Sequence, residues 1–223
     1  MNYKLFLQIF IPVILIFIFS YFTVISSIKN IRYKNLRKGN TQQYINNYSN
    51  VDKKCKDKVI LSFTTTPDRI KDITPMLLSL LDQTARVDQI SMNIPEKCND
   101  CSYDIPDEYK DICNIYTVGR DYGVGTKYVP TLLREDNCGT KIILVDDNKI
   151  YGKDFIEKII EESEKHPNKV IYVGPEFKGS SGILIKPEFI DRINHDKCDD
   201  IWLENNLKSD KIMLDYRDNK NYI

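Results

Sequence analysis

The first part of the chain contains a long stretch without charge. No charged residue lies between Leu5 and Ile28, where the sequence runs LFLQIFIPVILIFIFSYFTVISSI. As a helix with ~1.5 Å rise per residue it is roughly 36 Å long, enough to cross the ~30 Å hydrocarbon core of a bilayer. The apolar stretch of a cleaved signal peptide is shorter, about 7 to 15 residues, and ends at a small-residue cleavage site. We therefore expect residues 1–28 to form a transmembrane signal anchor rather than a cleaved signal.

The charges around this span leave its orientation open. Only Lys4 and the terminal amine precede the span, and a basic group follows it: Lys29, Arg32, Lys34, Arg37 and Lys38. The positive-inside rule keeps such a following domain in the cytosol. The glycosylation sequon Asn47-Tyr48-Ser49 points instead to a lumen. The sequence thus predicts a single-pass protein of an ER/Golgi-type or other internal membrane, with the side undecided.

Charge and cysteine content narrow the classes of partner. Lys+Arg and Asp+Glu both number 32, so the formal net charge is zero and no global basic field exists to bind a nucleic acid. The six cysteines, at positions 55, 98, 101, 113, 138 and 198, are compatible with disulfides in an oxidising compartment. Cys98, Cys101 and Cys113 can also begin a zinc site, but no second paired motif follows, so zinc is the less favoured interpretation.

Beyond the span, the sequence predicts a polar stalk and then one domain. Residues 29–57 are polar without a clear apolar period, and residues 58–223 alternate strand-like and helix-like runs. Strands are expected at 59–64, 89–94, 112–118, 141–145, 170–173, 183–185 and 211–214. Helices are expected at 73–81, 126–134, 153–165 and 199–207. Such alternation is typical of an α/β domain with a largely parallel sheet, whose ligands bind at the carboxyl ends of the strands.

One strand end carries the most specific chemistry. The apolar run Ile142-Ile143-Leu144-Val145 is followed directly by Asp146, Asp147 and Asn148. Hard divalent cations take oxygen ligands and bridge phosphate oxygens, so carboxylates at a rigid strand end suit a nucleotide diphosphate. A solvated acidic turn needs the same residues, because Asp and Asn are favoured in turns. The motif alone therefore leaves both interpretations open.

Five segments in order resemble the family 2-like, GT-A type glycosyltransferases over residues 58–215. They read FTTTPDRI from Phe63, SLLDQT from Ser79, NIP from Asn93, DYG with TK from Asp121, and VDDN with Tyr151 from Val145. The resemblance implies a GT-A-like, mixed but mostly parallel sheet flanked by helices and preceded here by one transmembrane helix. Residues 58–223 would then be the catalytic domain.

The resemblance also implies roles for individual residues. Nucleotide-sugar contacts would come from Thr64, Thr65, Pro67, Arg69, Asp121, Lys127 and Asp146. Arg69 offers a planar fork of donors for phosphate or base, although an exposed Arg at a helix start is an equal alternative. A metal, Mn²⁺ or Mg²⁺, would bind Asp147 and Asn148. The family has aspartate where Asn148 stands, so we expect weaker metal affinity or a ligand role shifted to Asp147.

A second acidic pair, Asp199-Asp200, resembles the family motif that supplies the general base. A carboxylate beside an acceptor hydroxyl deprotonates it during attack on the anomeric carbon. The alternative is two carboxylates stabilised by a helix dipole. Cys198 stands where the family has another acid, so the register between Asp199 and Asp200 stays open.

Together these residues imply a hexosyl or related transferase that moves a sugar from a nucleotide-sugar donor to a hydroxyl acceptor. The acceptor class, whether glycan, lipid or protein, is open, and direct attack by a base predicts inversion. A catalytically degenerate sugar- or nucleotide-binding membrane protein is the alternative that Asn148 suggests. A membrane-tethered binding module, with acidic clusters that are only turns, is a third.

Overall fold

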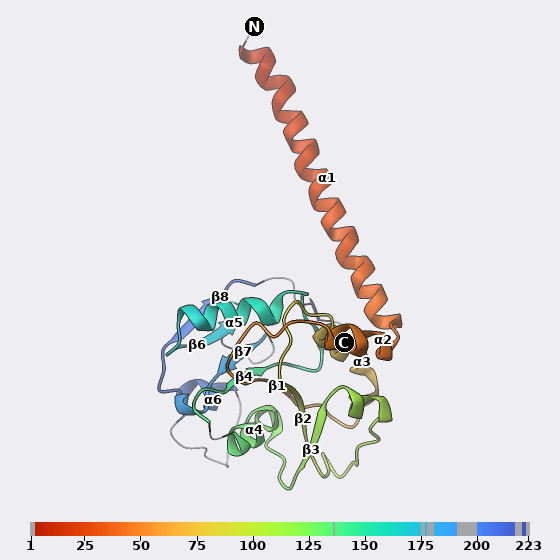
Figure 1. Cartoon of the computed structure of the whole chain (residues 1–223). Helices are drawn as coiled ribbons and strands as arrows, with labels where there is room; N and C mark the ends of the chain where they lie inside the picture. Colours follow the sequence, from red (N-terminus) through yellow and green to blue (C-terminus); the bar gives the residue numbers. More distant parts are fainter. Residues whose placement is uncertain are drawn as a thin grey trace. The chain divides into compact units, whose positions relative to one another are not determined.

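The computed structural model describes residues 3–135, 137–174, 177, 181–190, 200–216 and 220–221. The chain forms two compact units, Met1–Gly39 and Asn40–Ile223 (Figure 1). The larger unit holds the sheet and the pocket described below.

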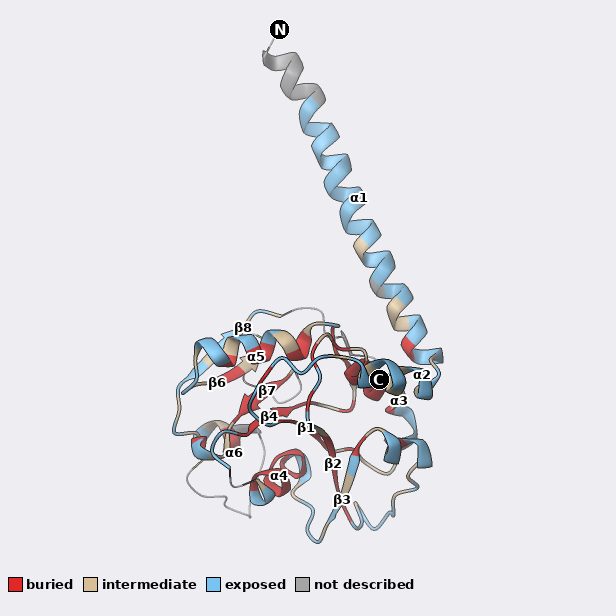
Figure 2. Ribbon diagram, in the orientation of Figure 1, coloured by how far each residue is buried: buried red, intermediate tan, exposed pale blue. Residues whose placement is uncertain are grey.

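The first unit is a single helix, α1 (Tyr3–Lys38), which includes Pro12. The segment Phe10–Lys38 has a mean hydropathy of 2.3 in its most apolar window, and none of that window is buried. Its exposed residues are coloured pale blue on the ribbon in Figure 2. By length and composition this helix can cross a membrane, and a signal sequence passes the same test.

The second unit is built on a seven-stranded sheet with the order β3-β2-β1-β4-β7-β6-β8. Only β7 runs against its neighbours, because β4 and β6 both pair with it in antiparallel fashion while the other pairs are parallel. The strands are β1 (Val59–Phe63), β2 (Gln89–Pro95), β3 (Asn114–Val118), β4 (Lys141–Leu144), β6 (Val170–Val173), β7 (Ile183–Ile185) and β8 (Lys211–Leu214). A small antiparallel pair joins β5 (Lys149–Ile150) to β9 (Lys220–Asn221).

The central strands are buried on both faces. Every residue of β1, β4 and β7 is buried, as the apolar runs in the sequence predict for strands covered by helices on each side (Figure 2). The α-helices of this unit are α2 (Thr41–Ser49), α3 (Thr74–Leu81), α4 (Val129–Arg134), α5 (Phe155–Lys165) and α6 (Asp200–Asn205). The 3₁₀ turns are η1 (Ile70–Asp72), η2 (Asp107–Asp111), η3 (Gly123–Lys127) and η4 (Pro187–Phe189). The predicted mixed, mostly parallel sheet flanked by helices is confirmed.

The helix α5 shows how the sequence sets this packing. Its buried residues Phe155, Ile156, Ile159 and Ile160 lie on one face, as the apolar spacing predicts. Gly182 precedes β7 with φ +120°, and a Cβ there would lie 2.6 Å from the Phe155 ring. A glycine is therefore required at the point where α5 covers the sheet.

Two local predictions differ from the structure. The helix expected at 126–134 is divided into η3 and α4, because Pro130 in the first turn of α4 has no N–H to continue a preceding helix. Within the segment expected to be a polar stalk, Thr41–Ser49 forms α2, whose Tyr48 hydroxyl accepts a hydrogen bond from Val87 N at 2.9 Å. This helix buries none of its residues, so no apolar period in the sequence predicts it.

Candidate functional site

A pocket of about 380 Å³ lies where the strand order reverses. The strands β2 and β3 follow β1 on one side of the sheet, and the next strand, β4, pairs with β1 on its other side. Such a switch point leaves a crevice at the carboxyl ends of the two strands. The pocket is lined by Thr64, Thr65, Thr66, Arg69, Pro95, Cys98, Tyr103, Asp121, Gly123, Val124, Lys127, Asp146, Asp147 and Asn148.

The turn after β4 is held rigidly by Tyr151. Its buried hydroxyl accepts a hydrogen bond from Asp146 N at 2.7 Å, and Tyr151 N donates to Ser79 Oγ at 3.0 Å. The Tyr151 ring also packs on Phe155, with centroids 4.7 Å apart. These contacts connect the turn to α3 and α5, so Asp146 and its neighbours project from a fixed backbone.

Asp147 is the most buried acid of the pocket. Its side chain is 4% exposed and forms an ion pair with Arg69, with Nη2 3.1 Å from Oδ2. Burial raises the pKa of Asp147 above its usual range, and the Thr65 hydroxyl and the Arg69 charge oppose this only in part. A carboxylate kept in such a position is poorly stabilised by the protein alone.

A second ion pair joins Asp146 to Lys127. The Lys127 ammonium is 2% exposed and lies 3.1 Å from Asp146 Oδ1, whereas the Asp146 side chain is 25% exposed. Lys149 adds positive charge nearby: burial lowers its pKa, the Asp146 charge raises it, and the Lys127 charge lowers it. The pocket therefore contains two acids at the end of β4 and a cation beside each one.

Asn148 contributes an unpaired oxygen to this turn. Its Oδ1 atom is buried and has no hydrogen-bond partner among the residues that the structure describes. An amide oxygen and the adjacent Asp147 carboxylate are donors that hard divalent cations accept, so these two residues fit a Mn²⁺ or Mg²⁺ ion. Within the described ranges, no group of three His, Cys, Asp or Glu is placed to hold a metal, so carboxylates alone do not complete a site.

A loop ahead of α4 forms the opposite wall. Asp121 Oδ1 accepts hydrogen bonds from Gly123 N at 2.7 Å and from Thr126 Oγ1 at 3.4 Å. Gly123 has φ +57°, a conformation that glycine adopts without strain. The Asp121 carboxylate thus shapes the loop that carries Lys127 into the pocket.

The residues of the pocket wall that were not predicted as site residues include Cys98 and Tyr103. The Tyr103 hydroxyl donates to Thr65 O at 3.0 Å, and burial raises the pKa of this phenol. Cys98 faces Asp121 and Tyr103, and burial raises the pKa of its thiol. Both residues lie on the connection between β2 and η2, where no apolar period indicates which side chains face the pocket.

The cysteine chemistry expected from the sequence is not formed among the described residues, where Cys55, Cys98, Cys101, Cys113 and Cys138 are free. Cys98 and Cys101 pair through both backbone hydrogen bonds across a turn in which Asn99 and Asp100 have positive φ. The less favoured zinc site at Cys98, Cys101 and Cys113 finds no support in that part of the chain. Cys198 lies outside the described residues.

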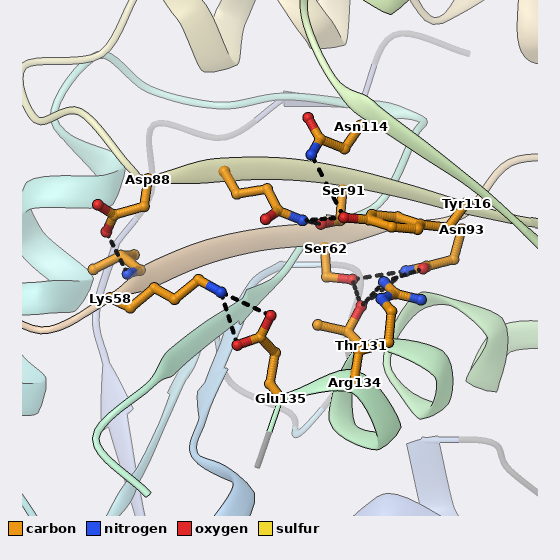
Figure 3. Close-up of polar contacts among 12 residues, drawn as sticks. Lys58, Ser62, Asp88, Ser91, Asn93, Asn114, Tyr116, Thr131, Arg134 and Glu135 are labelled. Atoms are coloured by element: carbon orange, nitrogen blue, oxygen red, sulfur yellow. Dashed lines mark hydrogen bonds and ion pairs between the residues drawn. The ribbon is translucent and has the colours of Figure 1, made fainter. Parts of the chain in front are cut away.

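A polar cluster, here called the Asn93 network, joins β1, β2 and α4 (Figure 3). It consists of three buried residues, Ser62, Asn93 and Thr131, and the exposed Arg134. Asn93 Nδ2 donates to Ser62 Oγ and to Thr131 Oγ1, each at 3.0 Å, and Asn93 Oδ1 accepts from Arg134 Nη2 at 2.8 Å. The Arg134 guanidinium also stacks on Tyr116, 3.7 Å from the ring centroid.

Ser62 connects the Asn93 network to the pocket. Ser62 Oγ donates to the backbone carbonyl of Lys127 at 2.5 Å, which connects β1 to the end of η3. Because Ser62 and Lys127 are both almost fully buried, this contact fixes the backbone from which the Lys127 ammonium extends. Asn93, part of a segment that carried the family resemblance, is therefore a buried positioning residue and not a pocket residue.

The structure brings most of the sequence-predicted site residues together. Around one pocket lie Thr64, Thr65, Arg69, Asp121, Lys127, Asp146, Asp147 and Asn148. Pro67 does not line it; it stands in the turn between β1 and η1. Asp199 lies outside the described residues, and Asp200 begins α6 with a side chain that the structure does not describe.

Comparisons with known proteins find similar folds among solved structures. The chain matches no protein-family model and no curated protein. Among solved structures it is similar to the mannosyltransferase PcManGT from Pyrobaculum calidifontis in complex with GDP-Man and Mn²⁺, with a TM-score of 0.52 and 10% identity. That match covers 83% of this chain, which spans 66% of the mannosyltransferase. HddC from Yersinia pseudotuberculosis matches with a TM-score of 0.46 and 14% identity, over 72% of this chain and 90% of that one.

At this level of identity the likeness to the mannosyltransferase concerns the fold alone. The chain has a GT-A-like fold, a mixed and mostly parallel sheet flanked by helices, as the sequence predicts.

Proposed function

We propose that this protein is a membrane-anchored glycosyltransferase that moves a hexosyl or related sugar from a nucleotide-sugar donor to a hydroxyl acceptor. One observation carries the proposal. Three segments far apart in the sequence, around Arg69, Lys127 and Asp147, meet in one pocket at the switch point of a GT-A-like sheet. Acidic side chains, which can hold a divalent cation, and basic side chains, which can bind phosphate, together suit a donor with a diphosphate.

In this proposal the residues of the pocket have distinct roles. Arg69 and Lys127 bind the diphosphate, since a guanidinium fork and a buried ammonium are both strong phosphate donors. Thr64 and Thr65 at the end of β1 hold the nucleotide, and Asp121 accepts hydrogen bonds from donor hydroxyls through the oxygen atom left over from its turn. Asp146 orients Lys127 through their ion pair.

The donor would be bound with a divalent cation, Mn²⁺ or Mg²⁺, held by Asp147 and Asn148. The buried, unpaired Asn148 Oδ1 and the poorly stabilised Asp147 carboxylate support this assignment. Such a cation supplies positive charge to the leaving diphosphate. That the similar mannosyltransferase was solved with GDP-Man and Mn²⁺ agrees with it.

The acceptor side is proposed from the sequence. Asp199 or Asp200 would deprotonate the acceptor hydroxyl, and direct attack on the anomeric carbon would invert its configuration. The helix α1 would anchor the enzyme in an internal membrane as a single-pass protein. The acceptor would be a glycan, lipid or protein, and nucleic acid is not a partner.

Nucleotide-dependent thermal unfolding of the detergent-solubilised full chain tests the proposal. UDP, GDP and CMP would each be added with and without Mn²⁺. We expect the unfolding temperature to rise with one nucleotide in a Mn²⁺-dependent manner, and we expect hydrolysis of the matching nucleotide sugar. A rise without hydrolysis would favour the degenerate binding protein, and no rise with any nucleotide would refute a donor site.

A further inference from the structure

The two ion pairs of the pocket differ in how firmly their cations are held. The Lys127 side chain is 2% exposed, and the carbonyl of the same residue is bound by Ser62. The Arg69 side chain is 40% exposed and extends from the short turn between β1 and η1. Lys127 is therefore a fixed cation, and Arg69 is a cation with room to move.

The pairing of Arg69 with Asp147 also leaves Arg69 incompletely satisfied. Nη2 lies 3.1 Å from Asp147 Oδ2, but Nε is buried and has no hydrogen-bond partner within the described part of the chain. A buried donor without a partner costs free energy. A position in which Nε also has a hydrogen-bond acceptor would thus lower the free energy of the Arg69 guanidinium.

A divalent cation at Asp147 would share one carboxylate with Arg69. A bound Mn²⁺ or Mg²⁺ lies within about 2.0–2.6 Å of its carboxylate ligand. Two cations on the Asp147 carboxylate repel each other, because this carboxylate is only 4% exposed and water screens the interaction weakly there. Metal binding at Asp147 therefore requires Arg69 to move, and a diphosphate in the pocket offers it a bidentate partner.

We infer that Arg69 exchanges partners when the site is loaded, pairing with Asp147 in the empty pocket and with the donor diphosphate once a divalent cation takes the Asp147 oxygen. This exchange rests on the proposed function. A cation bound at Asp147 releases Arg69 to pair with the diphosphate, and a diphosphate bound by Arg69 frees the Asp147 carboxylate for the cation. Cation and nucleotide therefore bind cooperatively. Arg69 is then the residue that makes the pocket bind the pair in preference to either ligand.

Calorimetric titration of the detergent-solubilised full chain measures the exchange directly. Mn²⁺ would be titrated alone and with saturating UDP or GDP, and each nucleotide would be titrated with and without Mn²⁺. In the wild type we expect each ligand to tighten the other by the same factor, on the order of tenfold, because coupling between sites is reciprocal. In Arg69→Gln we expect Mn²⁺ alone to bind several-fold tighter, the coupling to fall towards one, and the nucleotide to bind more weakly.

Lys71→Gln is the matched control, since it removes a cation on the neighbouring turn that pairs with Asp104 outside the pocket. It should leave all affinities as in the wild type. Unchanged or weaker Mn²⁺ binding in Arg69→Gln overturns the exchange. Independent affinities in the wild type overturn it too and leave the proposed function standing. A wild type that binds no nucleotide overturns both.

Discussion

The Asn93 network and the pocket at the ends of β1 and β4 lie on the same sheet and use the same kinds of side chain. In the network, every hydrogen of the Asn93 amide has an acceptor, and both hydroxyls of Ser62 and Thr131 take part (Figure 3). In the pocket, Asn148 Oδ1 and Arg69 Nε are buried without a partner among the described residues. A satisfied polar cluster stabilises a fold, whereas buried polar groups without a partner leave donors and acceptors that a ligand or a water molecule can use.

The largest expected effect concerns the network. Asn93→Leu removes the three hydrogen bonds that the buried Asn93 amide makes with Ser62, Thr131 and Arg134. We expect the free energy of unfolding to fall by about 3 kcal/mol, because each hydrogen bond contributes about 1 kcal/mol. Chemical denaturation measures this change.

The same substitution on β3, Asn114→Leu, is the control. Asn114 is exposed, and its side chain makes a long hydrogen bond to the Tyr116 hydroxyl at 3.5 Å. The free energy of unfolding of Asn114→Leu should stay within about 0.5 kcal/mol of the wild-type value. Equal losses of unfolding free energy in the two variants would mean that the network stabilises the fold no more than an exposed asparagine does.

The next largest effect concerns the pocket. Asp147→Asn removes a carboxylate whose pKa burial already raises, so the fold loses little and its stability should stay unchanged or rise slightly. Mn²⁺-dependent nucleotide binding should weaken by roughly 100-fold, the scale for altered metal sites. Calorimetry measures the affinity and denaturation the stability.

Asp210→Asn, at an exposed acid outside the pocket, should change neither quantity. If Asp147→Asn unfolded easily and still bound nucleotide normally, the pocket acids would be structural and the contrast with the network would be lost.

Lys127 belongs to both regions and should show an intermediate effect. Lys127→Met removes the ammonium beside Asp146 but keeps the backbone carbonyl that Ser62 binds. We expect nucleotide affinity to fall about tenfold, equivalent to 1.4 kcal/mol, and stability to fall by about 1 kcal/mol. Lys165→Met on α5, which lies away from the pocket, is the control. A loss of stability without a loss of affinity would assign Lys127 to the network alone.

The smallest expected effect is a gain. Asn148→Asp adds a negative charge beside the proposed cation, so Mn²⁺ should bind several-fold tighter, since charged ligands raise affinity for hard cations. Asn205→Asp, exposed on α6, adds the same charge elsewhere. If the aspartate variant at position 148 binds Mn²⁺ no tighter than the wild type, the assignment of this residue as a ligand is wrong.

The strands were predictable because their signals are local. The apolar runs at β4, β6 and β7 and the face of α5 follow from neighbouring residues, and the sequence placed β6, β7 and β8 at the bounds observed. The division of the 126–134 helix depends on Pro130, a signal that was present but outweighed by the apolar spacing around it. The helix α2 has no such signal, because it buries none of its residues.

The sequence by itself determined the order of strands and helices, the apolar span and the acids at the end of β4, because each depends on side chains adjacent along the chain. It did not reveal that Asn93 is hydrogen-bonded to Arg134, that Cys98 and Tyr103 line the pocket, or that Arg69 and Lys127 each pair with a different acid. Those facts arise where β1 lies between β2 and β4 and brings distant segments to one edge of the sheet. Only the tertiary structure decides which polar groups find partners there, because pairing depends on distances in space that spacing along the chain does not set.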